Sequence, residues 1–188
     1  MKFLSAALLY TGLILGANAA LAGPLQDAIE AAKGGDLKAL AVHADPKPLP
    51  ETQFETPEGK AGLDQYRGQY VVLNFWAVWC APCREEMETL SALEAEFGGE
   101  DFAVVTLATG PNAPPAIDKF LDEIEVENLP KYRDPRSELA RQIGVFGLPV
   151  TLILDREGRE LARLVGPADW HSDAARGIVQ GLIAAEGA

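Results

Sequence analysis

Cys80 and Cys83 are the only two cysteines of this 188-residue chain, and two residues separate them. A mostly apolar run, residues 70–76, precedes the pair, and a run with helical spacing of its apolar residues, 84–97, follows it. The cysteines are therefore predicted to lie where a buried strand passes into a helix. The start of a helix has unpaired N–H groups and a partial positive charge, so a cysteine there is stabilised as the thiolate.

This placement predicts thiol–disulfide exchange, with a different role for each sulfur atom. We expect Cys80 to be the attacking thiol, and Cys83, about one helical turn further on, to be the less exposed resolving thiol. Pro82 suits the first helical turn, where a missing N–H group is tolerated. A structural disulfide is an alternative, although so short a loop stabilises by only about 2 kcal/mol. Half of a zinc site is another, for which only the distant His43 and His171 could supply nitrogen ligands.

The composition is that of an ordinary globular protein with a strongly acidic balance. Hydrophobic residues make up 48% and charged residues 23% of the chain, and its net charge is −12. A chain of this length is enough for one domain with a substantial core. An acidic surface repels phosphate, so we expect no nucleic acid partner.

The first 22 residues have the pattern of an export signal. Lys2 provides the positive charge, residues 3–15 are mostly apolar, and small residues at Ala19 and Ala22 offer two cleavage sites, of which we favour Ala22. The alternative is an uncleaved membrane anchor, although the apolar stretch is short for a full span. We therefore expect a periplasmic protein, either released by cleavage or anchored to the inner membrane, in a compartment where unprotected thiols become disulfides.

The rest of the chain divides into two predicted parts. Residues 23–46 are expected to form a helical N-terminal extension, in which Gly34-Gly35 interrupts two helical pieces. Residues 47–188 are expected to form one domain that begins with a proline-rich linker. Its pattern predicts strands at 70–76, 102–108, 150–154 and 160–165, and helices at 84–97, 116–126, 137–143 and 170–185. This order indicates an α/β fold, a mixed sheet with helices on both faces.

Two motifs together resemble the thioredoxin fold: Trp79-Cys80-Ala81-Pro82-Cys83 after the first core strand, and Gly147-Leu148-Pro149-Val150-Thr151. The resemblance implies that Pro149 follows a cis peptide bond, lies beside the cysteines and helps to hold a substrate chain. The substrate-binding residues that it implies are Trp79, Ala81, Pro82, Leu148 and Pro149. We also expect Trp76 to contribute to the surface around Cys80, unless it is plain core.

The stretch from Leu73 to Met87 is similar to the exported TlpA/ResA/CcmG family, and Gly166-Pro167-Ala168-Asp169-Trp170 looks like its TlpA branch. This resemblance implies a periplasmic protein-disulfide reductase that a membrane electron donor of the DsbD/CcdA type keeps reduced. It also implies a catalytic role for Glu86, three residues after the second cysteine, where a carboxylate would raise thiol pKa values or accept a proton. The alternative for Glu86 is a solvated helix carboxylate, as expected of Glu85 and Glu88.

The resemblance implies two classes of partner and leaves a non-enzymatic alternative. The TlpA branch implies copper-centre assembly of cytochrome oxidase, through a Sco-like copper chaperone and the copper-binding subunit. The first alternative is reduction of the haem-site cysteines of apocytochrome c. The second is a chaperone that binds Cu(I) through both thiols, since sulfur ligands suit Cu(I).

The reductase mechanism needs no cofactor and no metal. A peroxidase is not expected, because the Thr-x-x-Cys motif that such an enzyme would need upstream of the helix is missing. Glu88 stands where the family usually has a proline that kinks the active-site helix, which leaves the helix geometry open. A CxxC motif does not by itself set the direction of electron flow, since the reduction potentials of CxxC proteins of one fold range from about −120 to −270 mV.

Overall fold

A computed structural model describes residues 23–185, and its centre is the strand β4 (Tyr70–Trp76), which is buried at every position. The run is apolar on both sides of the chain, so both of its faces are covered by other elements. Strand β5 (Phe102–Thr109) pairs with β4 in parallel, and β7 (Val150–Leu154) pairs with it in antiparallel orientation. The mixed sheet predicted from the order of elements is therefore confirmed.

Five more strands extend this sheet to eight, in the order β1-β8-β7-β4-β5-β6-β2-β3. One side adds β6 (Tyr132–Asp134) and the hairpin of β2 (Phe54–Thr56) and β3 (Gly59–Ala61). The other side adds β8 (Glu160–Val165), which forms the predicted hairpin with β7, and then β1 (Ala41–Lys47) at the edge.

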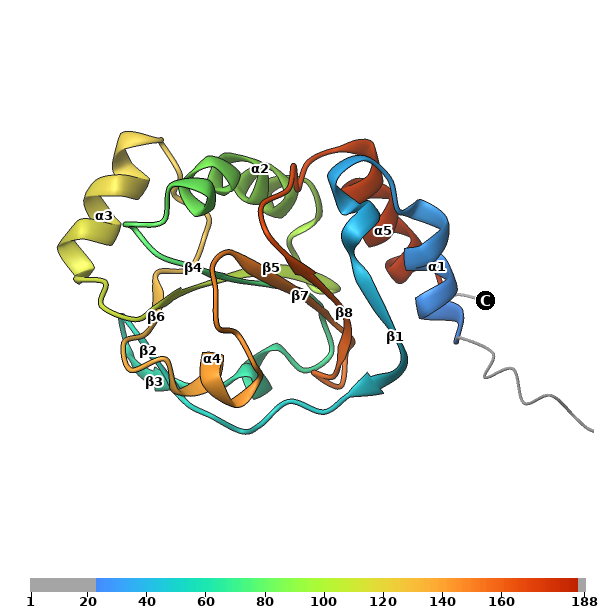
Figure 1. Cartoon of the computed structure of the whole chain (residues 1–188), viewed down its shortest axis with the longest axis horizontal. Coiled ribbons are helices and arrows are strands. Elements are labelled where there is room, and N and C mark those ends of the chain that lie inside the picture. The colour runs from blue at the N-terminus through green and yellow to red at the C-terminus, as the bar shows by residue number, and fades with distance from the viewer. Residues whose placement is uncertain (1–22, 186–188) are drawn as a thin grey trace, which may run out of the picture.

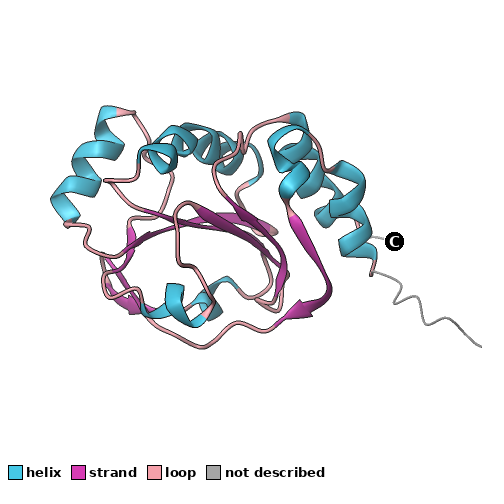
Figure 2. Ribbon diagram, in the orientation of Figure 1, coloured by secondary structure: helices cyan, strands magenta, loops and turns pink. Residues whose placement is uncertain are grey.

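Helices cover the two faces of the sheet unequally (Figures 1 and 2). One face carries α1 (Pro24–Ala32), α2 (Ala81–Phe97), α3 (Pro114–Glu123) and α5 (Asp173–Ala184). The other carries α4 (Glu138–Gln142) and the 3₁₀ helix η2 (Leu63–Tyr66). Alternate residues of β4 serve the two resulting cores, because successive side chains of a strand point to opposite faces. Trp76 lies in the core under α2, and Phe75 in the core over α4.

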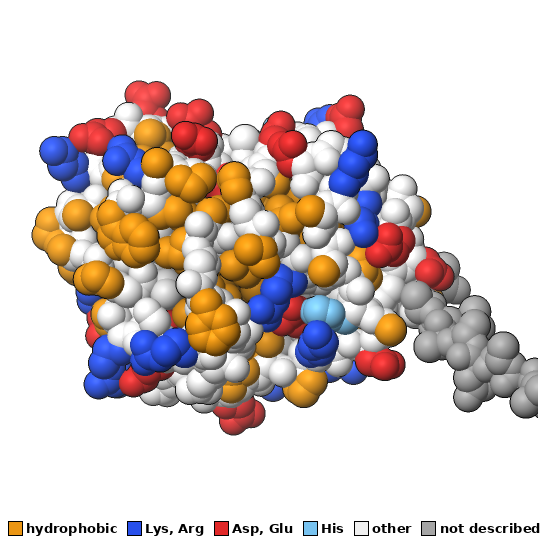
Figure 3. Space-filling model, viewed as in Figure 1, with side chains coloured by type: hydrophobic (Ala, Val, Ile, Leu, Met, Phe, Trp, Pro, Cys, Tyr) orange, Lys and Arg blue, Asp and Glu red, His pale blue; other side chains and the backbone are white. Residues whose placement is uncertain are grey.

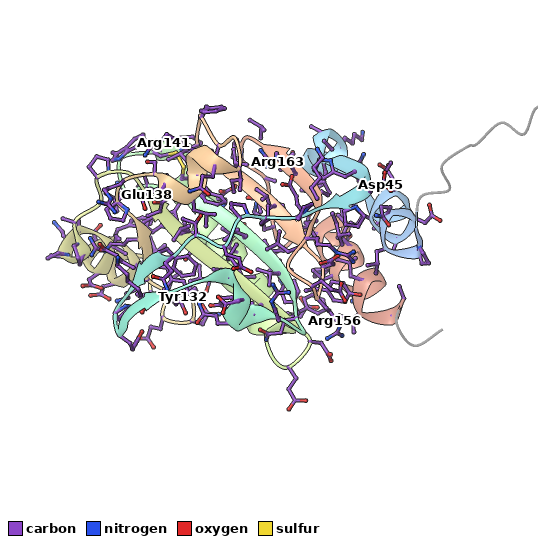
Figure 4. The ribbon with its side chains drawn as sticks, turned by 90° about the horizontal axis from the view of Figure 1, so that it is seen from below. Asp45, Tyr132, Glu138, Arg141, Arg156 and Arg163 are labelled. Carbon is purple, nitrogen blue, oxygen red and sulfur yellow. A yellow bond between two sulfur atoms is a disulfide. The ribbon has the colours of Figure 1, made fainter. Side chains whose placement is uncertain are left out.

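The N-terminal extension is only partly helical, which corrects the prediction. Helix α1 and the 3₁₀ helix η1 (Gly35–Ala39) occupy its first part, on either side of the Gly34-Gly35 break as expected. From Ala41 onward, however, the chain is strand β1, and Ala41 pairs with Arg163 at the edge of the sheet (Figure 4, where Arg163 is labelled). Pairing with a distant strand overrides the local preference of this segment, as often happens at sheet edges.

Strand β1 ends at Lys47 and so crosses the predicted boundary between residues 46 and 47. His43 on β1 also contacts Glu160 on β8, with 2.8 Å between His43 Nε2 and Glu160 Oε1. The division into an extension and a domain remains a prediction. The predicted signal peptide or anchor, residues 1–22, lies outside the described residues. Within residues 23–185 no helix combines the length and the apolar character needed to span a membrane.

Candidate active site

Cys80 and Cys83 lie at the start of α2 and are joined by a disulfide bond. Cys80 is the residue that caps the helix N-terminus, and Cys83 lies within the first turn, with Pro82 between them as predicted. The exposed fraction is 6% for Cys80 and 0% for Cys83. Both cysteines are thus buried in the disulfide form, Cys80 slightly less than Cys83, and their roles as attacking and resolving thiol remain predictions. Helix α2 runs without interruption through Glu88, the position that departs from the family.

The turn that presents Cys80 is held by a residue that the sequence analysis missed, Asn112. The N–H of Cys80 donates to the carbonyl of Ala77 at 3.0 Å and closes the turn. Within this turn, the N–H of Val78 donates to Asn112 Oδ1 at 2.9 Å. Asn112 is only 4% exposed, and its Nδ2 donates to the carbonyl of Thr109 at 3.0 Å. The loop after β5 thereby anchors the loop after β4.

The peptide bond between Leu148 and Pro149 is cis, as the resemblance implied. Pro149 directly precedes β7, whose first residue, Val150, pairs with Phe75 near the end of β4. That end of β4 leads into the cysteines. The pairing of Val150 with Phe75 therefore brings the Pro149 loop to the same end of the central strands as the cysteines. The carbonyl of Pro149 accepts a hydrogen bond of 3.0 Å from the N–H of Gly166. This places the motif Gly166–Trp170 next to it.

Glu86 is buried in the same helix, with an exposed fraction of 2%. Its Oε1 accepts a hydrogen bond of 2.7 Å from Asn74 Nδ2, and its Oε2 accepts one of 3.2 Å from Trp170 Nε1 and one of 3.3 Å from the N–H of Ala168. Burial raises the pKa of Glu86 from 4.5 to about 7, and these hydrogen bonds oppose part of that rise. The alternative of a solvated carboxylate is therefore wrong for Glu86, whereas Glu85 and Glu88 are exposed as expected.

Asn74 and Thr151 complete this buried polar cluster and were also missed. Asn74 lies in the middle of β4, and its Nδ2 donates both to Glu86 and to Thr151 Oγ1, at 2.9 Å. Both residues are fully buried. The signal was present, because Asn74 is the one polar side chain in the run 70–76 apart from the ring hydroxyl of Tyr70 and the indole of Trp76. A buried amide is retained where it has a partner to bind.

Three large hydrophobic side chains are exposed in the part of the chain that the structure describes. They are Trp79 at 62%, Phe146 at 86% and Val165 at 72%. Each is close in sequence to the cysteines, to Pro149 or to Gly166, which the contacts above bring to one end of the central strands. Figure 3 shows hydrophobic side chains gathered on this face over α3, the start of α2 and the loop before β7. Trp76, expected either at this surface or in the core, is a core residue with an exposed fraction of 1%.

The two histidines lie apart from the cysteines and bind carboxylates. His43 contacts Glu160, and His171 Nε2 lies 2.8 Å from Glu96 Oε2. No group of three or more potential metal-ligating side chains (His, Cys, Asp or Glu) occurs among residues 23–185.

The chain is similar in sequence to a known protein family and to thiol-disulfide oxidoreductases. Residues 47–159 match the model of the AhpC/TSA family. The thiol-disulfide oxidoreductase ResA of Bacillus thuringiensis subsp. konkukian is 26% identical over 107 residues, which are 57% of this chain and 61% of ResA. The thiol:disulfide interchange protein DsbE of Allochromatium vinosum is 31% identical over 126 residues, 65% of this chain and 67% of DsbE. The chain thus spans about three fifths of ResA and two thirds of DsbE.

A solved structure from Chlorobium tepidum, provisionally named thiol:disulfide interchange protein DsbE, has the same fold. It superposes with a TM-score of 0.62 at 27% identity and covers 74% of this chain and 96% of its own. The thioredoxin fold inferred from the two motifs is therefore confirmed.

Proposed function

Because the chain belongs to the AhpC/TSA family of thioredoxin-like proteins, we propose that it is an exported thiol-disulfide oxidoreductase that reduces disulfide bonds of partner proteins. The observation that carries this proposal is the Cys80–Cys83 pair at the start of α2, beside the cis-Pro149 loop. A thiolate at a helix N-terminus is stabilised and reactive. The names of the relatives ResA and DsbE support the same chemistry.

The reaction begins with the reduced protein. The Cys80 thiolate attacks one sulfur of the partner disulfide, so a bond forms between Cys80 and the partner while the partner's other sulfur leaves as a thiolate. The Cys83 thiolate then attacks Cys80 Sγ, which closes the internal disulfide and releases the second partner thiolate. Two electrons have passed from this protein to the partner. The disulfide form described above is the product, and a membrane donor of the DsbD/CcdA type would reduce it again.

Two residues other than the cysteines have roles in this proposal. Glu86 lies one helical turn after Cys83. When charged, its carboxylate opposes a nearby thiolate and can take up a proton, and when protonated it can donate that proton. Pro149 and Leu148 offer the cis-proline loop to an extended partner chain, and Trp79, Ala81 and Pro82 form the opposite side of that contact. The exposed apolar side chains on this face support a protein rather than a small molecule as the partner.

For the partner we propose copper-centre assembly of cytochrome oxidase, on the resemblance of the Gly166–Trp170 motif to the TlpA branch. The partners would be a Sco-like copper chaperone and the copper-binding subunit. Reduction of apocytochrome c is the second candidate, favoured by the similarity to ResA and DsbE. To distinguish the two candidates, the reduced protein is mixed with the purified disulfide form of each partner class, and the two rates of disulfide reduction are compared. The true partner should be reduced at a rate at least ten times higher than the other.

The proposal is tested first by the reduction potential of the Cys80/Cys83 couple in dithiothreitol buffers. A reductase requires a potential near that of thioredoxin, about −250 mV or lower. A potential near that of DsbA, about −120 mV, would identify a disulfide donor and overturn the proposed direction. The variant Cys83→Ser should accumulate a mixed disulfide between Cys80 and the partner, whereas Cys80→Ser should form none. Equal trapping by both variants would contradict the assigned order of attack.

The copper chaperone alternative makes a different prediction for the same cysteines. Both sulfur atoms would have to bind one Cu(I) ion tightly enough to survive competition by a chelator such as bicinchoninate. We expect the reduced protein to lose Cu(I) to that chelator and to keep its disulfide-reducing activity. Retention of one copper per chain would instead favour the chaperone function.

A further inference from the structure

The motif Gly166–Trp170 forms a loop that reaches from β8 to α5 and closes over the buried carboxylate of Glu86. Ala168 and Trp170 in this loop are 8% and 1% exposed and belong to the core, whereas Pro167 and Asp169, before and between them, are exposed. Two N–H groups of the loop, the backbone N–H of Ala168 and the indole Nε1–H of Trp170, donate to the same oxygen, Glu86 Oε2. The other oxygen is left to Asn74, on the opposite side of the carboxylate.

A second contact fixes the loop against the same turn of α2. The N–H of Trp170 donates to Thr89 Oγ1 at 3.1 Å, and Thr89 Oγ1 in turn donates to the carbonyl of Glu86 at 2.9 Å. Ser172, two residues further on, caps α5 by accepting from the N–H of Ala175. The loop is therefore held at both ends, and its indole is presented to Glu86 in one orientation.

We propose that Trp170 is a positioning residue of the active site, whose indole N–H holds the Glu86 carboxylate in place and sets the pH range in which Glu86 is charged. This inference rests on the proposed function, because it concerns the residue that acts on the cysteine thiols. A neutral donor aimed at a carboxylate stabilises the charged form. Burial works in the opposite direction, so the charge of Glu86 depends on the balance between its surroundings and its three donors.

The structure supplies both the test variant and a matched control. Trp170→Phe removes the indole N–H and keeps an aromatic ring. Trp76→Phe makes the same change in a second buried tryptophan, whose Nε1 has no hydrogen-bond partner among the described residues. Both variants lose similar volume from the same core cluster, but only Trp170→Phe removes a donor from Glu86.

The experiment follows the titration of Glu86 by carbon NMR of its side-chain carboxyl, assigned with Glu86→Gln, in the full-length reduced protein. We expect Trp170→Phe to move the Glu86 titration upward by about one pH unit, the size of one charge-assisted hydrogen bond. Trp76→Phe should leave it in place. An unmoved titration in Trp170→Phe, or an equal movement in Trp76→Phe, would overturn the inference.

Two further measurements keep the result decisive. Should Trp170→Phe fail to fold, 3-benzothienylalanine at position 170 keeps both fused rings and removes only the N–H, so the same upward movement is required of it. The pH profile of Cys80 alkylation by iodoacetamide is recorded in parallel, and it should move to lower pH because Glu86 stays neutral over a wider range. A moved Glu86 titration with an unmoved alkylation profile would uphold the positioning role and refute the proposed action of Glu86 on the thiols.

Discussion

At the scale of single residues, Glu86 combines a position readable from the sequence with an environment that is not. Its spacing from Cys83 places it one helical turn away, which any α-helix provides. Its three donors come from two elements distant in sequence, one from β4 and two from the Gly166–Trp170 loop. A carboxyl group in that environment has a pKa of about 7, close to the pH at which it would exchange protons with the thiols.

The raised pKa of Glu86 predicts how stability depends on pH. The folded protein holds the Glu86 proton up to about pH 7, whereas the unfolded chain releases it near pH 4.5. The folded state therefore binds more protons across this interval, and the stabilisation present below pH 4.5 is lost as the pH rises through 7. The loss amounts to about 3 kcal/mol. Glu86→Gln should remove this contribution, so its free energy of unfolding should fall less steeply between pH 4.5 and 8.

Urea denaturation of both proteins at pH values from 4.5 to 8 measures this difference. The comparison of slopes matters rather than the absolute stability, because the amide also changes the hydrogen bonds with Asn74 and Trp170. Parallel curves for the two proteins would show that Glu86 keeps an ordinary carboxyl pKa in the folded state.

At the scale of elements, three loops meet at one end of the central strands and form the site. The loop after β4 ends at Cys80 and leads into α2 with Cys83, the loop before β7 carries Pro149, and the loop after β5 carries Asn112. Each strand brings its loop there because β4 and β5 are parallel and β7 is antiparallel to β4. The hydrogen bond from Val78 to Asn112 is a direct link between two of these loops.

Asn112 is therefore expected to set how fast the internal disulfide closes. Asn112→Ala leaves the N–H of Val78 without its acceptor, so the turn before Cys80 loosens and Cys83 meets Cys80 Sγ less often. The lifetime of the mixed disulfide should lengthen about tenfold, the effect of one hydrogen bond lost in the reactive geometry. Stopped-flow tryptophan fluorescence during the reaction with a protein disulfide measures this rate.

Asn112→Asp is the matched variant, because it keeps an oxygen for the N–H of Val78 and loses the donors to the carbonyls of Thr109 and Gly110. The lifetime of its mixed disulfide should lie between that of the original protein and that of Asn112→Ala. An unchanged rate of disulfide closure in Asn112→Ala would mean that the turn at Ala77–Cys80 is stable without the hydrogen bond to Asn112.

At the scale of the whole molecule, the apolar side chains around the cysteines contrast with a chain of net charge −12. Acidic side chains lie along the α2 and α5 side in Figure 3, above the hydrophobic area. Phe146 is the most exposed of the three large apolar residues and belongs to the same loop as Pro149. We expect it to bury its ring against the partner protein.

Phe146→Ser should therefore weaken docking without changing the chemistry. The KM for a protein disulfide should rise roughly tenfold, as expected from losing one buried aromatic contact, while kcat stays the same. Reduction of a small disulfide, 5,5′-dithiobis(2-nitrobenzoate), serves as the control and should proceed at an unchanged rate. A slower reaction with the small disulfide would show that Phe146 acts on the cysteines rather than on the partner.

The N-terminal segment, residues 23–46, lies outside the family match but packs against the rest of the protein. Helix α1 lies along α5, where a Cβ atom at Gly181 would come within 3.2 Å of the Cβ of Ala28. Strand β1 then joins the sheet beside β8, and His43 on it meets the buried Glu160. The segment is thus packed against the domain from both its helix and its strand.

The sequence by itself determined the local features of this protein. Seven mostly apolar residues made β4 a buried strand, apolar spacing predicted α2, and the spacing of Cys80 and Cys83 placed both thiols in one helical turn. The hairpin of β7 and β8 and the cis bond before Pro149 were also predicted. These features depend on residues that are neighbours in the chain, or on motifs short enough to recognise.

Only the tertiary structure decided what surrounds them. Asn74, Ala168 and Trp170 reach Glu86 across 12, 82 and 84 positions, and Asn112 reaches Val78 across 34. Residues 41–46, predicted to be helical, became a strand because the edge of β8 offered hydrogen bonds that no local pattern reveals. Periodicity reports which side of an element is buried, but the partner that a buried polar atom or a strand edge finds is set by the packing of distant segments.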